Sequence, residues 1–64
     1  MTVKQFLEIA TGIDEYEISS SDTYIFFSPA RKDTYIAEYG EREIEDIYFY
    51  VDSCDQRCCD ITIK

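Results

Sequence analysis

The segment EREIEDIYFYVD, residues 41 to 52, restricts the fold of this chain more than any other part of its sequence. Its second half alternates between apolar residues and polar or tyrosine residues, the apolar set being Ile47, Phe49 and Val51. Side chains of a β-strand point alternately to opposite faces, so the pattern predicts a strand with one apolar face and one acidic, tyrosine-rich face. We predict a long strand at residues 43 to 53. The alternative is a helix at residues 41 to 46, because Glu and Arg favour helices.

A short helix is predicted near the N-terminus, at residues 3 to 11. Thr2 precedes Gln5 by three residues, which is the pattern of a capping box, and Gly12 suits the position just after a helix. The apolar residues between them recur at helical spacing: Val3, Phe6, Leu7 and Ala10. A helix this short is unstable alone in water, so its apolar side must pack on another element.

Most of the remaining chain is predicted to form strands. Residues 14 to 19 and 59 to 63 alternate between polar and apolar side chains, and residues 23 to 28 are rich in β-branched and aromatic residues. A further strand is predicted at residues 34 to 39, ending at Gly40. The connections between successive strands are short, which predicts antiparallel neighbours. The expected fold is therefore a single α+β domain, residues 1 to 64, with one N-terminal helix packed on one face of a four- to five-stranded antiparallel meander sheet.

The period of two also assigns side chains to faces. The helix residues Phe6, Leu7 and Ala10 are expected to pack on the apolar side of residues 43 to 53, and the last strand adds Cys59, Ile61 and Ile63 to the same side. The second and third strands are apolar or aromatic on both faces. If their inner residues are Ile25, Phe27 and Ile36, their outer residues are Tyr24, Phe26, Tyr35 and Tyr39. Large exposed apolar patches usually mark contact sites.

The charge and composition exclude several functional classes. Fourteen acidic residues against six basic ones give a net charge of −8, which repels nucleic acid and anionic membranes. The chain has no His, the commonest general base, and the serines at residues 19 to 21 are best explained as a turn. We therefore predict a non-enzymatic protein with no catalytic residues and no cofactor, which binds neither nucleic acid nor membrane directly.

The cysteines and the N-terminus indicate the compartment. No apolar run approaches the roughly 18 residues of a membrane span, and the N-terminus lacks the contiguous apolar stretch of a signal peptide, so a cytoplasmic protein is expected. Reduced thiols are then favoured for Cys54, Cys58 and Cys59. Their spacing fits no standard zinc motif, so no metal site is predicted. A disulfide between Cys54 and either of the other two remains an alternative under oxidising conditions.

The acidic and tyrosine-rich side of the opening segment is the candidate binding site. Alternate strand residues lie about 6.6 Å apart, so acids at these positions form a spaced row of negative charge, as DNA phosphates do. Such a row can occupy the basic groove of a nucleic-acid-processing enzyme, and tyrosine is enriched at protein interfaces. The predicted partner-binding residues are Glu43, Glu45, Asp46, Tyr48, Tyr50 and Asp52. The alternative is that these charges only protect a small sheet from edge-to-edge aggregation.

Three parts of the chain resemble small acidic α+β proteins carried by bacteriophages and mobile elements. They are the opening MTVKQFLEIA, the segment YGEREIEDIY and the strand-rich tail. Proteins of this kind include anti-CRISPR proteins, which block host nucleic-acid enzymes by binding their basic surfaces. The resemblance implies a phage-type inhibitor and assigns no residue a role. The alternative is a homo-oligomeric structural or accessory domain, whose surplus aromatics would pair in a homodimer.

Overall fold

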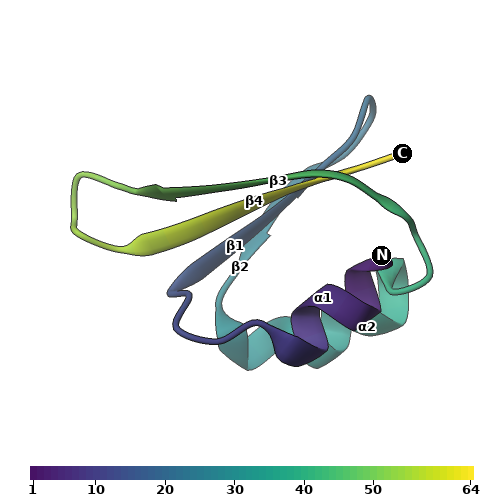
Figure 1. Ribbon diagram of the computed structural model, residues 1–64, viewed down its shortest axis with the longest axis horizontal. Coiled ribbons are helices and arrows are strands. Elements are labelled where there is room, and N and C mark those ends of the chain that lie inside the picture. The colour runs from purple at the N-terminus through teal and green to yellow at the C-terminus, as the bar shows by residue number, and fades with distance from the viewer.

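The computed structural model describes residues 1 to 64 and contains two helices, one short 3-10 turn and a four-stranded sheet (Figure 1). The elements in chain order are α1 (Val3–Ile9), β1 (Glu15–Ser19), β2 (Tyr24–Phe27), η1 (Pro29–Arg31), α2 (Lys32–Tyr39), β3 (Ile44–Val51) and β4 (Arg57–Ile63). The α+β class is therefore confirmed.

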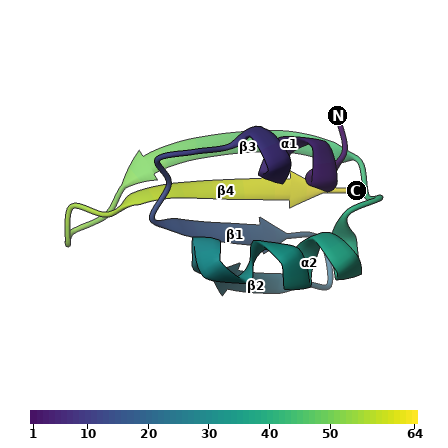
Figure 2. The same ribbon diagram turned by 90° about the horizontal axis from the view of Figure 1, so that it is seen from below.

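The sheet is mixed, with the strand order β2-β1-β4-β3. The outer pairs β1–β2 and β3–β4 are antiparallel hairpins, whereas the central pair β1–β4 is parallel. The prediction of an antiparallel meander was therefore wrong. The two hairpins are joined through α2, which lies beneath β1 and β2 and carries the chain back across the sheet (Figure 2).

The predicted strand at residues 34 to 39 was also wrong, because this segment belongs to α2. Pro29 occupies the first position of the preceding 3-10 turn, where its fixed φ favours helix initiation. Four residues of α2 are partly buried, and they recur at spacings of three and four residues, as on one side of a helix: Lys32, Tyr35, Ile36 and Tyr39. Tyr35 and Tyr39 were expected on the outer face of this strand, and that expectation was wrong because both residues lie in α2. Tyr35 instead stacks on Phe27 with ring centroids 4.4 Å apart, on the helix side of the sheet.

The N-terminal helix begins as predicted and ends two residues early. The capping box of Thr2 and Gln5 is present in both directions. Ala10 already has extended dihedrals, so α1 stops at Ile9 rather than at residue 11. Both helices cover the same face of the sheet, as Figure 1 shows. The core between these layers contains Val3, Phe6, Leu7, Tyr16, Ile18, Phe27, Cys59, Ile61 and Ile63.

The predicted strand at residues 43 to 53 is present as β3, and the helical alternative for residues 41 to 46 is wrong. Alternation along β3 is interrupted once, by a register shift between Ile44 and Asp46 that leaves Glu45 without a partner. The other strands lie close to their predicted positions, except that β4 begins at Arg57, two residues before its expected start. Local pattern thus located the four strands that exist, but it also predicted a fifth at residues 34 to 39 and did not give the strand order.

Candidate protein-interaction face

One face of the sheet is covered by no other element. The helices pack on one side, where the alternate residues of β4, Cys59, Ile61 and Ile63, are buried (Figure 1). The residues between them, and those paired with them across the sheet, point to the other side, which we call the open face. From the pairing register, the open face carries four carboxylates, Glu15, Glu17, Asp46 and Asp60, and four aromatic side chains, Tyr24, Phe26, Tyr48 and Tyr50.

No strand residue of the open face is basic. The only Lys or Arg within the four strands is Arg57, and its position in the alternation of β4 puts it on the helix side. The Arg57 backbone N–H donates to Asp14 Oδ2 at 2.8 Å, and this bond, together with the guanidinium Nε 3.5 Å from the same oxygen, holds the pKa of Asp14 below its usual value. Every charged strand residue of the open face is therefore acidic, and Lys64, just beyond the end of β4, is the nearest basic residue in the alternation.

Glu17 lies at the centre of the open face and joins the two edge strands. The Tyr24 hydroxyl on β2 donates to Glu17 Oε2 at 2.7 Å, and the Tyr50 hydroxyl on β3 donates to Glu17 Oε1. These bonds leave Glu17 only 7% exposed and meet the requirement that a buried carboxylate be hydrogen-bonded. The bond to Glu17 also raises the pKa of Tyr24, which keeps that phenol protonated as the donor.

The aromatic side chains form two pairs on either side of Glu17. Tyr48 and Tyr50 are stacked with centroids 5.7 Å apart, and Tyr24 and Phe26 lie tilted at 6.3 Å. Tyr24, Phe26 and Tyr48 are all exposed. Aromatic rings offer a large contact area with few rotatable bonds, which is why interfaces favour them. The open face thus presents aromatic area around a fixed negative charge.

The structure divides the predicted partner-binding residues into two groups. Asp46, Tyr48 and Tyr50 lie together on the open face, opposite Thr62, Asp60 and Cys58 of β4. Glu45 is the exposed extra residue at the register shift, and Glu43 precedes β3, with its carboxylate 3.3 Å from the N-terminal amine.

Asp52 follows β3 on the open-face side, where its Oδ2 accepts a weak hydrogen bond from the Cys58 thiol at 3.8 Å, and its other carboxylate oxygen shapes the β3–β4 turn. Asp52 Oδ1 accepts hydrogen bonds from the backbone N–H groups of Cys54 at 2.8 Å and Gln56 at 3.0 Å. Such side-chain-to-backbone bonds stabilise turns. Asp55 in the same turn has a φ of 60°, a left-handed conformation that Asp tolerates better than most residues. Asp52 therefore has a structural role in the turn, and its predicted contact with a partner stays a prediction.

Sequence reasoning did not assign Glu17 and Asp60 to the site. The sequence did contain a signal for them, because each carboxylate lies between two apolar residues of a strand and so points to the face opposite the core. Their proximity was hidden because it depends on the parallel pairing of β1 with β4, where Glu17 is the direct partner of Asp60. Asp60 also accepts a hydrogen bond from the Ser19 hydroxyl at 3.2 Å.

The three cysteines are free thiols in different environments. Cys54 is exposed in the turn, whereas Cys58 and Cys59 are buried on opposite faces of β4. Burial raises the pKa of Cys59 to about 11, and burial also raises the pKa of Cys58. Thiols with raised pKa values hold less of the nucleophilic thiolate at neutral pH. The structure contains no cluster of three or more side chains suited to holding a metal ion.

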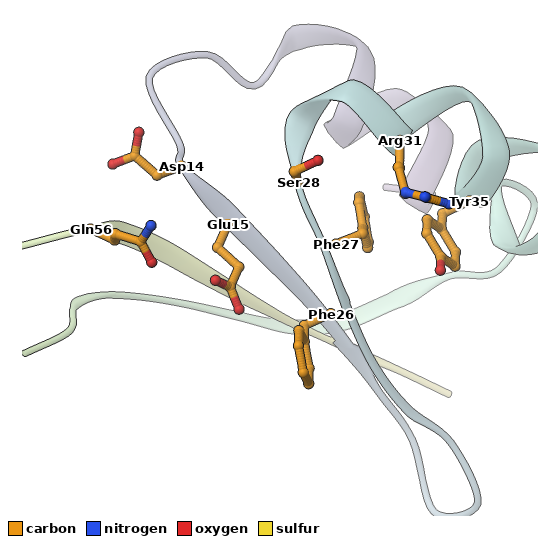
Figure 3. Close-up of a pocket in the computed structure, with 8 residues that line it drawn as sticks. All are labelled: Asp14, Glu15, Phe26, Phe27, Ser28, Arg31, Tyr35 and Gln56. Atoms are coloured by element: carbon orange, nitrogen blue, oxygen red, sulfur yellow. The ribbon is translucent and has the colours of Figure 1, made fainter. Parts of the chain in front are cut away.

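A depression of about 470 Å³ lies where β1 and β2 meet the start of η1 (Figure 3). Figure 3 shows that its side chains diverge: Glu15 and Phe26 point away from the helices, and Phe27 lies against Tyr35 beneath them. Ser28 is the only aliphatic hydroxyl in the lining, and the chain has no His to activate it. The depression marks the boundary between the two faces of the sheet and assembles no nucleophile–base pair.

No protein-family model, curated protein or solved structure matches this chain. Neither helix has the length and apolar character needed to cross a membrane. The chemistry of the open face is therefore the basis on which a function can be proposed for this chain.

Proposed function

We propose that this chain is a non-enzymatic binding protein whose open face occupies a basic, nucleic-acid-binding surface of another protein. The observation that carries the proposal is the uncovered sheet face with four carboxylates, four aromatic side chains and no basic strand residue. An inhibitor of the phage type, as anti-CRISPR proteins are, would act in this way in the cytoplasm of its host. Inhibition would be steric, because a groove filled by the open face cannot admit nucleic acid.

The charge distribution favours a basic partner over other classes. Complementary charge steers the approach of two proteins and raises the association rate, while aromatic side chains supply contact area after docking. Glu17 adds rigidity, because its hydrogen bonds to Tyr24 and Tyr50 fix both edge strands relative to the centre. A face held in its bound shape loses less entropy on binding.

Capture of partners from a host lysate at two salt concentrations tests this proposal. We expect the immobilised chain to retain basic nucleic-acid-binding proteins at about 0.05 M NaCl. At about 0.5 M NaCl the retained amount of these proteins should fall by a factor of about ten or more, because salt screens exposed charges. Retention that does not change with salt, or a captured set without basic proteins, would contradict the proposal. Self-association of the chain in place of capture would favour the homo-oligomeric alternative.

A further inference from the structure

β3 is an edge strand, and part of its outer backbone is unpaired. Asp52 N donates to Gln56 O at 3.0 Å at the end of the β3–β4 hairpin. Hydrogen-bonded and non-hydrogen-bonded pairs alternate along an antiparallel ladder, so Tyr50 and Tyr48 bond to β4. The N–H and C=O groups of Val51, Phe49 and Ile47 therefore point away from the sheet, and none of them makes a backbone bond outside the ladder.

The beginning of the same edge is already occupied by the chain itself. Ile44 N donates to Met1 O at 2.9 Å, and Thr2 forms an antiparallel bridge with Glu43. The register shift that follows at Glu45 separates this covered part from the rest of β3. Register shifts and charges of this kind protect sheet edges from unwanted pairing. The free edge is thus confined to Ile47–Val51.

The two sides of the free edge have different chemistry. On the open face, Tyr48 and Tyr50 are stacked, with Asp46 next along the strand. On the helix side, Phe49 and Val51 are 58% and 63% exposed. A depression of about 290 Å³ lies at this end of the edge and is lined mainly by apolar side chains and by one basic residue: Ile13, Phe49, Tyr50, Val51, Cys58 and Arg57. A segment added at this edge would place its alternate residues over these two surfaces.

We infer that Ile47–Val51 accepts an extended segment of the basic partner as an added antiparallel strand with alternating Lys or Arg and apolar residues. The basic residues lie opposite Tyr48 and Tyr50, where rings and carboxylates attract cations. The apolar residues lie opposite Ile47, Phe49 and Val51 and cover the exposed side chains. This inference rests on the proposed function and adds the form of the partner segment. A second copy of this chain fits less well, because each copy carries a net charge of −8.

Two synthetic peptides of equal composition test the inference, one alternating Arg and Val and one with its Arg and Val residues in separate blocks. We expect the alternating peptide to bind at least about tenfold more tightly. Only in this peptide can the Arg residues all lie on the tyrosine side of the edge while the Val residues all lie on the apolar side. N-methylation of its valines removes the donors to the carbonyls of β3 and should weaken binding by about tenfold or more. N-methylation of its arginines alters N–H groups that point away from β3, and binding should change by less than about threefold.

Val51→Pro tests the hydrogen-bond donors of β3, because it removes an outward N–H without breaking a bond to β4, and proline is tolerated at such edge positions. Val51→Thr keeps the N–H and the β-branch and serves as the matched control. We expect binding of the alternating peptide to be lost in Val51→Pro and kept in Val51→Thr, with unchanged circular dichroism in both.

Several results would overturn the inference. Equal binding of the alternating and block peptides would exclude edge pairing and leave the proposed charge-based function standing. Equal loss of binding on methylation of the valines or of the arginines would also exclude edge pairing. Failure of both peptides to bind would also exclude edge pairing. The proposed function would then be decided by the charge-reversal variants of the open face, which test it separately. A homodimer that competes with the peptide would assign the edge to a second copy of the chain.

Discussion

Ile61→Ala is expected to remove roughly half of the folding free energy of this protein. Ile61 is 0% exposed on the central strand β4, where it pairs with Ile18 of β1 and Ile47 of β3. Truncation of a buried Ile to Ala costs about 2–5 kcal/mol through lost burial and the cavity that remains. At roughly 0.05–0.15 kcal/mol per residue, the whole domain has only about 3–10 kcal/mol of stability.

Ile9→Ala is the matched control for this prediction. It makes the same substitution at a side chain that is 68% exposed at the end of α1, where little apolar area is lost. We expect it to change the free energy of unfolding by less than about 0.5 kcal/mol. Urea unfolding followed by far-ultraviolet circular dichroism measures both variants. Similar losses in the two would show that Ile61 does not lie in the core.

The double variant Glu15→Lys with Asp46→Lys is expected to weaken partner binding by about 100-fold, because like charges brought together across an interface cost several kcal/mol. Both positions lie on the open face, one on β1 and one on β3. Neither carboxylate makes a side-chain hydrogen bond or ion pair within the protein, so the fold should tolerate the change. Glu17 is kept, since its replacement would break the bonds to Tyr24 and Tyr50.

Glu8→Lys with Glu41→Lys changes the net charge equally and provides the control. Glu8 is exposed on α1 and Glu41 is exposed in the turn after α2, so neither lies on a strand of the open face. Binding by this control is expected to fall by less than about threefold, through long-range steering alone. Isothermal titration with a captured partner gives both affinities. Equal weakening in the two variants would mean that net charge, and not the open face, determines binding.

Local patterns in the sequence predicted five of the elements because each depends on neighbouring residues. The capping box fixed the start of α1, and alternation placed Ile47, Phe49 and Val51 on the helix side of β3. The segment TYIAEY was misinterpreted because aromatic and β-branched residues favour strands, while its burial at Tyr35, Ile36 and Tyr39 follows a helix. Packing on Phe27 outweighed that local preference.

Strand order was beyond the reach of local pattern. The pairing of Tyr16 with Cys59 joins distant parts of the chain, and a parallel pair requires a crossover that the predicted meander lacked. The candidate site was therefore only half predicted. Its β3 members, Asp46, Tyr48 and Tyr50, follow from alternation, whereas Glu17 and Asp60 join them only through the β1–β4 pairing.

Competition between this protein and duplex DNA for one captured partner tests the central claim most directly. The partner is titrated with labelled DNA at increasing concentrations of the chain, and DNA binding is followed by fluorescence anisotropy. If the open face occupies the nucleic-acid-binding surface, the apparent dissociation constant for DNA rises linearly with the chain concentration from its value without the chain, and no ternary complex forms. A ternary complex with unchanged affinity for DNA would contradict the account.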